Sequence, residues 1–272
     1  MSSSTYVRLA AAAMALLVAA CSSPSSPDPA ARQPAAPSSS PAPSAPAKPK
    51  PCGPGAKAFW LPGPEDTKLE ANSFGHGATA AVFLHEAGGA ADMCGFWPFA
   101  KWLAVHRHVR VVLFNRCIYG RSTCQVFQRG DDGIIGEVQP AVDWARQHGA
   151  RHVTLVGASS GASDALQAAG VVRHVDALVD LSGDSPDTGA NDLVDARRVH
   201  VPALFAVAPG DRYASSARVK DVYHATPART KRLVIVRDAP GTHGWDLLYD
   251  YETGSFTPLA HLVAEWVAGR RA

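Results

Sequence analysis

The sequence predicts an α/β fold with a mostly parallel sheet, because strand-like and helix-like segments alternate along most of its length. Continuous apolar runs are typical of parallel strands that are buried on both faces. Six such runs, rich in Val, Leu, Ile and Phe, lie at 78–84, 109–115, 152–157, 176–182, 202–208 and 232–237. Segments of helical length separate or follow them, at 95–107, 134–149, 160–170, 215–226 and 257–269. This order favours a sheet with helices on both faces.

Two further strands are expected ahead of the parallel part. The segments 57–61 and 67–74 flank the turn-rich sequence PGPED, which predicts an antiparallel hairpin and brings the sheet to eight strands. Only a short polar connection separates the runs at 176–182 and 202–208, which is too little for a large cap domain. We therefore expect an open cleft.

The N-terminal segment has the composition of an export signal. Residues 1–20 contain one positive charge followed by an apolar run that is too short to span a bilayer stably. The run ends in LVAAC, which resembles the lipobox of bacterial lipoproteins, in which the cysteine is diacylated and becomes N-terminal after cleavage. That resemblance implies that Cys21 anchors the protein to a membrane of the cell envelope, outside the cytoplasm. An ordinary secretory signal with an incidental cysteine is the alternative.

The remaining chain divides into a tether and one domain. Residues 21–51 are mostly Ser, Pro and Ala, a composition that cannot bury enough apolar surface to fold, so we expect a disordered tether behind the anchor. Residues 52–272 have the length of a single α/β domain. The net charge is only +2 and no basic stripe is present, so no nucleic-acid partner is expected.

The cysteines after Cys21 predict disulfides. Cys52, Cys94, Cys117 and Cys124 are even in number, and a chain exported to an oxidising compartment is expected to pair them. Three connectivities remain open. A zinc site is the competing interpretation, but the spacings contain no C-x-x-C pair, so we expect neither a metal nor another cofactor.

Polar residues follow several predicted strands at the edge of the sheet where α/β proteins bind ligands. Ser159 lies in the sequence Gly-Ala-Ser-Ser-Gly after the run 152–157, Asp211 follows 202–208, and His243 lies in a Gly-flanked loop after 232–237. A serine hydroxyl is a poor nucleophile until a histidine removes its proton, and an aspartate fixes the tautomer of that histidine.

These residues resemble the α/β-hydrolase superfamily, in particular serine esterases and lipases and minimal folds of the dienelactone-hydrolase kind. The Gly-x-Ser-x-Gly frame resembles the nucleophile elbow, and the order Ser159, Asp211, His243 is the order of that superfamily's triad. Ser160 is the alternative nucleophile in a looser frame. Asp184 is the alternative acid, because it also follows a predicted strand, whereas two other aspartates near His243 are weaker candidates, namely Asp238 and Asp246.

The resemblance also implies an oxyanion hole. The backbone amide of Ser160 follows the nucleophile and is one expected donor. The second is expected from the loop His85–Gly89, from the amide of Ala87 rather than that of Glu86. A buried His85 is expected to hold this loop by hydrogen bonds. The segment 115–122, NRCIYGRS, resembles the Asp-x-Arg-Gly-x-Gly-x-Ser loop of the same superfamily.

The sequence therefore favours a serine hydrolase that cleaves a small-molecule or lipid-like ester through an acyl-enzyme, as carboxylesterases do, and that acts as a monomer. An envelope acyltransferase on the same fold is one alternative, because an alcohol can replace water as the acceptor. A catalytically inactive binding lipoprotein is the other.

Overall fold

The described chain forms an eight-stranded sheet. The computed structural model describes residues 48–88, 91–124, 131–183 and 191–271. The sheet order is β1-β2-β4-β3-β5-β6-β7-β8. Its strands are β1 (Lys57–Pro62), β2 (Lys68–Phe74), β3 (Thr79–Leu84), β4 (Arg110–Phe114), β5 (His152–Ala158), β6 (Ala177–Leu181), β7 (Ala203–Val207) and β8 (Lys231–Ile235).

The strand directions confirm the predicted mostly parallel sheet. β1 pairs antiparallel with β2, and β2 pairs antiparallel with β4. Every pair from β4 through β3, β5, β6 and β7 to β8 is parallel. Because the strands from β3 to β8 are parallel, their carboxyl ends lie along one edge of the sheet, and the loops that carry the candidate residues follow these ends.

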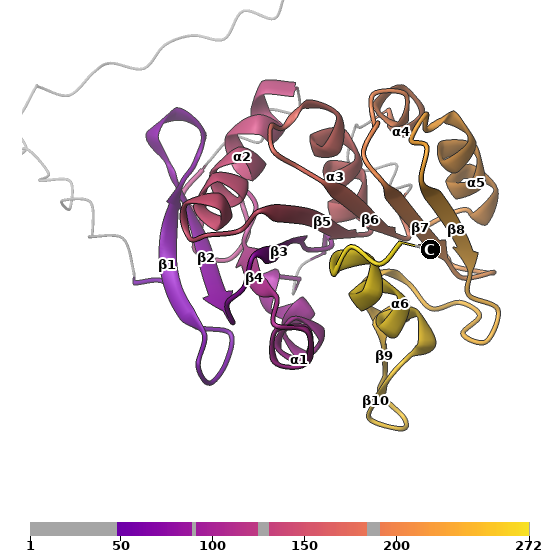
Figure 1. The fold of residues 1–272 in the computed structure, drawn as a ribbon, viewed down its shortest axis with the longest axis horizontal. Helices are drawn as coiled ribbons and strands as arrows, with labels where there is room; N and C mark the ends of the chain where they lie inside the picture. Colours follow the sequence, from indigo (N-terminus) through magenta and orange to yellow (C-terminus); the bar gives the residue numbers. More distant parts are fainter. Residues whose placement is uncertain (1–47, 89–90, 125–130, 184–190, 272) are drawn as a thin grey trace, which may run out of the picture. The chain divides into compact units, whose positions relative to one another are not determined.

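Helices cover both faces of the sheet (Figure 1). The helices are α1 (Trp97–Arg107), α2 (Asp131–Gln147), α3 (Ser160–Val171), α4 (Asp192–Ala196), α5 (Ser216–Ala225) and α6 (Pro258–Val267). One buried apolar cluster joins the sheet to α2, α3, α4 and α5, and a second joins the opposite face to α1 and α6. The predicted helical segments are confirmed, and the two clusters explain why the central strands are apolar on both sides.

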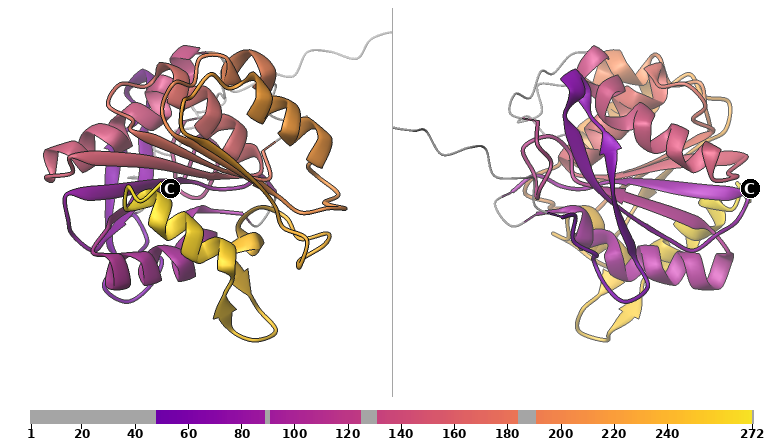
Figure 2. Two further views of the ribbon diagram at one scale, coloured as in Figure 1. Left: turned by 45° about the vertical axis from the view of Figure 1, so that its right-hand side comes forward. Right: turned by 90° about the vertical axis from the view of Figure 1, so that its left-hand side faces the viewer.

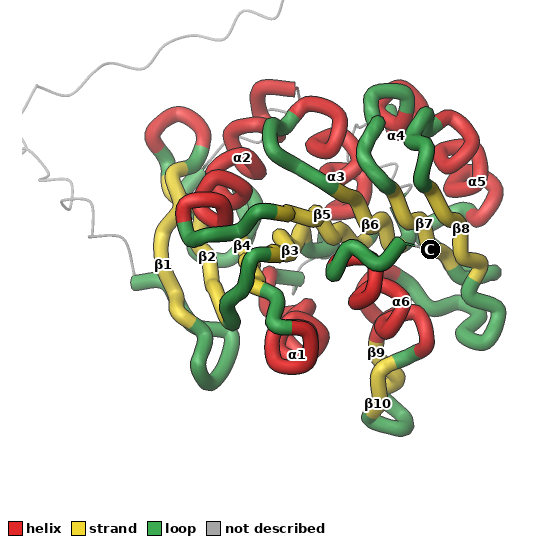
Figure 3. The backbone as a smooth tube through the Cα atoms, viewed as in Figure 1, coloured by secondary structure: helices red, strands yellow, loops and turns green. Residues whose placement is uncertain are grey.

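Short elements lie outside the predicted pattern. α4 lies in the connection between β6 and β7, and a 3-10 helix η4 (Gly244–Leu248) follows β8. A two-stranded hairpin of β9 (Tyr249–Asp250) and β10 (Ser255–Phe256) separates η4 from α6 (Figures 2 and 3). α6 begins sharply because Pro258 occupies its first turn and the Thr257 hydroxyl caps the amide of Ala260. Two further 3-10 helices are η1 (Pro64–Asp66) and η2 (Met93–Phe96).

Two disulfides join the expected cysteines and select one connectivity of the three. Cys52 is bonded to Cys94, and Cys117 is bonded to Cys124. The first bond holds the start of the domain against η2, and the second closes the loop after β4. The described chain starts beside β2, where the amide of Cys52 donates a hydrogen bond to Asn72 Oδ1 at 2.8 Å. Within the described residues, no helix has the length and apolar character needed to cross a membrane.

Candidate active site

Ser159 lies on a sharp turn between β5 and α3. Its backbone has φ 52° and ψ −125°, an unusual conformation for a residue that is not glycine. The residue directly precedes the first turn of α3, where backbone amides have no partner within the helix. Only 9% of Ser159 is exposed. The turn therefore holds the serine at the carboxyl edge of the sheet, next to the positive end of a helix.

Small residues allow this turn to pack closely. A Cβ added to Gly157 would lie 2.2 Å from the carbonyl oxygen of Gly161. A Cβ added to Gly161 would lie 2.2 Å from the carbonyl oxygen of Leu84 and 2.4 Å from that of His85. The two glycines of the Gly-x-Ser-x-Gly frame are thus required by backbone contacts, and the second presses the elbow against the end of β3.

The hydroxyl of Ser160 belongs to a buried polar network. It accepts a hydrogen bond of 2.8 Å from Nη2 of Arg116, and Nη1 of the same guanidinium forms an ion pair with Asp164. Arg116 is 1% exposed and follows β4, whereas Ser160 and Asp164 lie in α3. This network therefore fixes the first turn of α3 to the loop after β4.

His85 connects the same loop to the end of β3. Its side chain is fully buried, and burial, reinforced by the nearby Arg116 charge, holds its pKa well below the usual value. The imidazole is neutral: Nε2 accepts the Arg116 amide at 3.2 Å, so Nδ1 carries the proton and donates to the Glu86 carbonyl at 2.7 Å. The expected role of His85, a buried residue that holds its loop by hydrogen bonds, is confirmed.

Asp211 and His243 form a hydrogen-bonded pair. Nδ1 of His243 lies 2.9 Å and 2.8 Å from the two carboxylate oxygens of Asp211, whose side chain is fully buried. The carboxylate also accepts the amides of Tyr213 and Ala214, which fixes its orientation. Because Nδ1 faces Asp211, Nε2 of the imidazole is the nitrogen that remains for proton transfer.

The loop that carries His243 is fastened across the end of β5. The amide of Gly244 donates to Ser182 Oγ after β6 at 3.1 Å, and the amide of Trp245 donates to a Glu86 carboxylate oxygen after β3 at 2.8 Å. β3 and β6 are the two neighbours of β5, so the His243 loop passes over the end of β5, which Ser159 follows. Among the described residues, no hydrogen bond joins the Ser159 hydroxyl to His243.

Glu86 is a half-buried acid at the centre of these contacts. Burial raises its pKa to about 7; the hydrogen bond from the Trp245 amide lowers this pKa, and the Asp246 and Asp211 carboxylates raise it. Glu86 therefore titrates near neutrality while it holds the first turn of η4.

Among the described residues, no other predicted position forms a hydrogen bond with the His243 imidazole. Asp238 and Asp246 are exposed, and among the described residues Asp211 is the acid that His243 contacts. Asp184, the alternative acid, lies outside the described residues. Ala87 is exposed beside Glu86 at the end of β3, so the predicted oxyanion loop follows the strand next to the elbow.

Sequence reasoning did not identify the roles of Arg116 and Glu86 in holding the site together. Arg116 could have been noticed because a charged residue directly follows the apolar run 109–115. Nothing in the sequence shows that Glu86 contacts the Trp245 amide, because the two residues are far apart in the chain.

Comparisons with known proteins point to one fold. No family model matches the chain, and no curated protein matches it. An esterase from Pyrococcus furiosus aligns with 80% of this chain and 91% of its own at 16% identity and a TM-score of 0.63. An α/β serine hydrolase without a lid from Xanthomonas campestris aligns with 70% of this chain and 87% of its own, at 20% identity and a TM-score of 0.56.

A third similar structure is an esterase from Exiguobacterium antarcticum. It aligns with 78% of this chain and 99% of its own, at 12% identity and a TM-score of 0.61. At these identities the similarity concerns the fold, and it agrees with the strand order, the helices on both faces and the short connection between β6 and β7. The chain therefore has the α/β-hydrolase fold, without a large cap in its described residues.

Proposed function

We propose that the protein is a serine hydrolase that cleaves a carboxylic ester, with Ser159 as nucleophile, His243 as base and Asp211 as the acid that orients it. The observation that carries this proposal is the presence, at one sheet edge, of a strained serine before a helix and of a half-buried histidine paired with a buried aspartate side chain. Strained backbone is concentrated at functional sites. The Arg116 contact of Ser160 supports Ser159 over its neighbour, because the Ser160 hydroxyl already serves the network beneath the elbow.

The proposed reaction has two steps. Ser159 Oγ attacks the ester carbonyl while Nε2 of His243 takes the hydroxyl proton, and that proton then passes to the alcohol oxygen as its bond to the acyl carbon breaks. Water, activated by the same nitrogen, attacks the acyl-serine, releases the carboxylic acid and restores the serine hydroxyl. Asp211 keeps the proton of the neutral imidazole on Nδ1 and stabilises the imidazolium.

The oxyanion of each tetrahedral intermediate needs hydrogen-bond donors. The first is the amide of Ser160, which opens α3 and lies at the positive end of its dipole. The second comes from the loop after β3, where the Ala87 amide is our candidate. The buried His85 and the contact of Gly161 with the end of β3 support a fixed distance between the two donors.

The proposal is tested on a panel of short acetate esters with purified variants. Ser159→Ala is expected to lower kcat/KM by about 10³-fold or more, because it removes the nucleophile. Ser160→Ala, the matched control, keeps its backbone amide and is expected to lose far less. Asp211→Asn is expected to lower kcat by about 10⁴-fold through the wrong histidine tautomer. Full turnover by Ser159→Ala would refute the proposal.

A further inference from the structure

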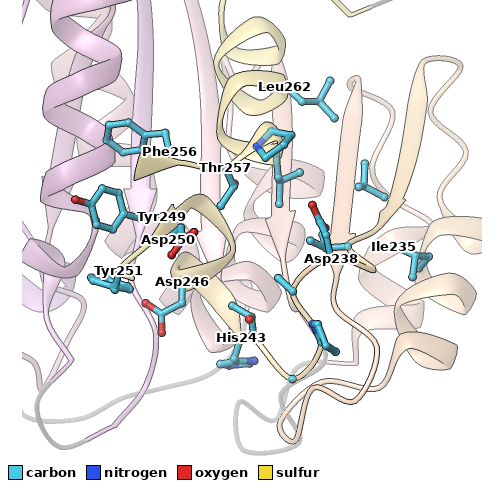
Figure 4. A pocket seen from close by; sticks show the side chains of 18 of the residues that line it. Ile235, Asp238, His243, Asp246, Tyr249, Asp250, Tyr251, Phe256, Thr257 and Leu262 are labelled. Carbon is cyan, nitrogen blue, oxygen red and sulfur yellow. The ribbon is translucent and has the colours of Figure 1, made fainter. Parts of the chain in front are cut away.

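An elongated groove lies beside His243. It encloses about 1180 Å³ between β8 with the loop that follows it on one side and β9, β10 and the start of α6 on the other. Figure 4 shows His243 at one end and Leu262 of α6 at the other. None of the described residues that line the groove comes from the elbow or from the loop after β3. His243 is therefore the member of the candidate triad that lines the groove.

The position of the histidine indicates which part of an ester enters this space. During acylation the acyl carbon is bonded to Ser159 and its carbonyl oxygen faces the Ser160 amide, whereas the leaving oxygen must face Nε2 of His243 to receive its proton. A group attached to that oxygen lies on the His243 side of the reacting centre. We infer that the groove binds the alcohol portion of an elongated ester, an inference that rests on the proposed function.

The lining specifies the chemistry of that alcohol. Buried or half-buried apolar side chains line the groove and suit a hydrocarbon chain, namely Val234, Val236, Phe256, Leu259 and Leu262. Six charged side chains also line the groove, and all except Asp250 are exposed: two arginines, Arg212 and Arg232, and four acids, Asp238, Asp246, Asp250 and Glu252. This excess of negative charge favours an uncharged or cationic alcohol over an anionic one.

Two aromatic side chains border the end near the reacting centre. Tyr213 is 69% exposed with its ring 5.0 Å from that of His243, and Tyr251 is 63% exposed on the turn after β9. Exposed aromatic rings provide apolar contact with little loss of conformational entropy. They extend the apolar surface of the groove towards the leaving oxygen, so the alcohol can remain in contact with protein along its length.

The test compares the hydrolysis of ethyl, butyl and octyl acetates by the full-length protein and by three variants. For the unaltered protein, kcat/KM is expected to rise about two- to fourfold for each methylene that enters the groove. Leu262→Trp blocks the distal end, so the octyl-to-ethyl ratio is expected to fall at least tenfold, and Leu262→Phe, with less added bulk, is expected to give an intermediate fall. Val105→Trp adds the same bulk to an exposed site on α1 outside the groove and is expected to leave the ratio unchanged.

The results distinguish binding of the alcohol portion in the groove from binding of the acyl chain there, and from failure of the proposed function. An unchanged ratio in both Leu262 variants would refute the groove, while loss of activity in Ser159→Ala would still support the proposed function. A Leu262 effect on ethyl octanoate instead of octyl acetate would assign the groove to the acyl chain and overturn the inference. The acetate ester of 3-hydroxypropanoate, whose negative charge lies close to the leaving oxygen and so near Asp246, is expected to react at least tenfold less efficiently than butyl acetate, and equal efficiency would contradict the assigned charge preference.

Discussion

Ser159 keeps a backbone conformation that costs about 1–3 kcal/mol for a residue other than glycine. Contacts around it maintain this conformation: its amide donates to the Leu181 carbonyl at 2.9 Å, and the helix that follows is held by Arg116. The Gly-x-Ser-x-Gly frame predicted the turn because only small residues allow it. The frame did not reveal the Arg116 network, because an ion pair between distant segments leaves no local pattern.

Glu86 gives the protein a specific pH dependence of stability. Its pKa is about 7 in the folded state against 4.5 as the ordinary value, so the folded state binds the proton more tightly. This tighter proton binding stabilises the folded state by about 3 kcal/mol. The stabilisation is fully present below about pH 4.5 and is lost as the pH rises through 7. Glu86→Gln keeps an acceptor for the Trp245 amide but does not titrate. The free energy of unfolding of this variant, relative to that of the unaltered protein, is therefore expected to increase as the pH rises from 4.5 to 7.

The measurement is chemical denaturation of both proteins from pH 4.5 to pH 8. The buried His85 opposes Glu86, because its lowered pKa removes stability as the pH falls through its ordinary value of 6.5. Both proteins contain His85, so the difference between them isolates Glu86. A difference that does not vary with pH would show that burial does not raise the pKa of Glu86.

The buried ion pair of Arg116 and Asp164 predicts a non-additive response to mutation. Arg116→Met removes the guanidinium from a buried carboxylate and is expected to lower the free energy of unfolding by about 3–5 kcal/mol. The double variant Arg116→Met/Asp164→Leu removes both charges and is expected to be less destabilised than Arg116→Met alone. Urea denaturation measures both, and strictly additive losses would argue against direct coupling.

Among the secondary-structure elements, β3 and α3 approach each other closely at Gly161. Gly161→Ala would place a methyl group against the carbonyl oxygens of Leu84 and His85, so it is expected to lower the free energy of unfolding by about 2 kcal/mol or more. Gly136→Ala in α2 is the matched control. Its new Cβ would lie 3.0 Å from the Cβ of Pro64, which must shift slightly, but alanine favours the helix, so the expected loss is smaller than for Gly161→Ala. Thermal and urea unfolding that affect both variants equally would contradict the close approach.

The larger elements could be predicted from the sequence because their apolar patterns are strong. All six continuous runs became strands of the sheet, and five of them, β3 to β7, are buried because helices cover both faces, whereas β8 at the sheet edge is half-buried. The hairpin of β9 and β10 could not be predicted, because each of its strands has only two residues, which is too few to show an alternating apolar pattern. α4 was missed for a similar reason: five residues capped by Asn191 carry little periodicity.

At the scale of the whole molecule, the proposed anchor concerns where the domain acts. We propose that Cys21 carries the lipid and that residues 22–51 connect it to the domain, outside the cytoplasm. Cys21→Ser is expected to move the protein from the membrane fraction to the soluble fraction, because two acyl chains supply most of the membrane affinity. Fractionation of cells that express the full chain measures this, with Cys52→Ala/Cys94→Ala as a control that removes a pair of cysteines but not the anchor. Membrane association of the Cys21→Ser variant would refute the proposed anchor.

The fold and the positions of the candidate site residues could be predicted from the sequence, whereas the contacts that fix the geometry of the site could not. Chain order and spacing place Ser159, Asp211 and His243 after the ends of β5, β7 and β8, and this is sufficient to predict one shared sheet edge. The contacts that fix their geometry come from residues brought together by folding, such as Glu86 with Trp245 and Gly244 with Ser182. Which residues meet in these contacts depends on the paths of the loops, and no short sequence pattern predicts those paths. The groove between β8 and α6 depends on the same loop paths.

The central claim is that Ser159 is an activated nucleophile. Its most direct test is covalent labelling of the purified domain with a fluorophosphonate, followed by peptide mass spectrometry to locate the adduct. The proposed function predicts one adduct, on Ser159, that is lost in Ser159→Ala and strongly reduced in His243→Ala. An adduct on Ser160, or none on a folded domain, would contradict it.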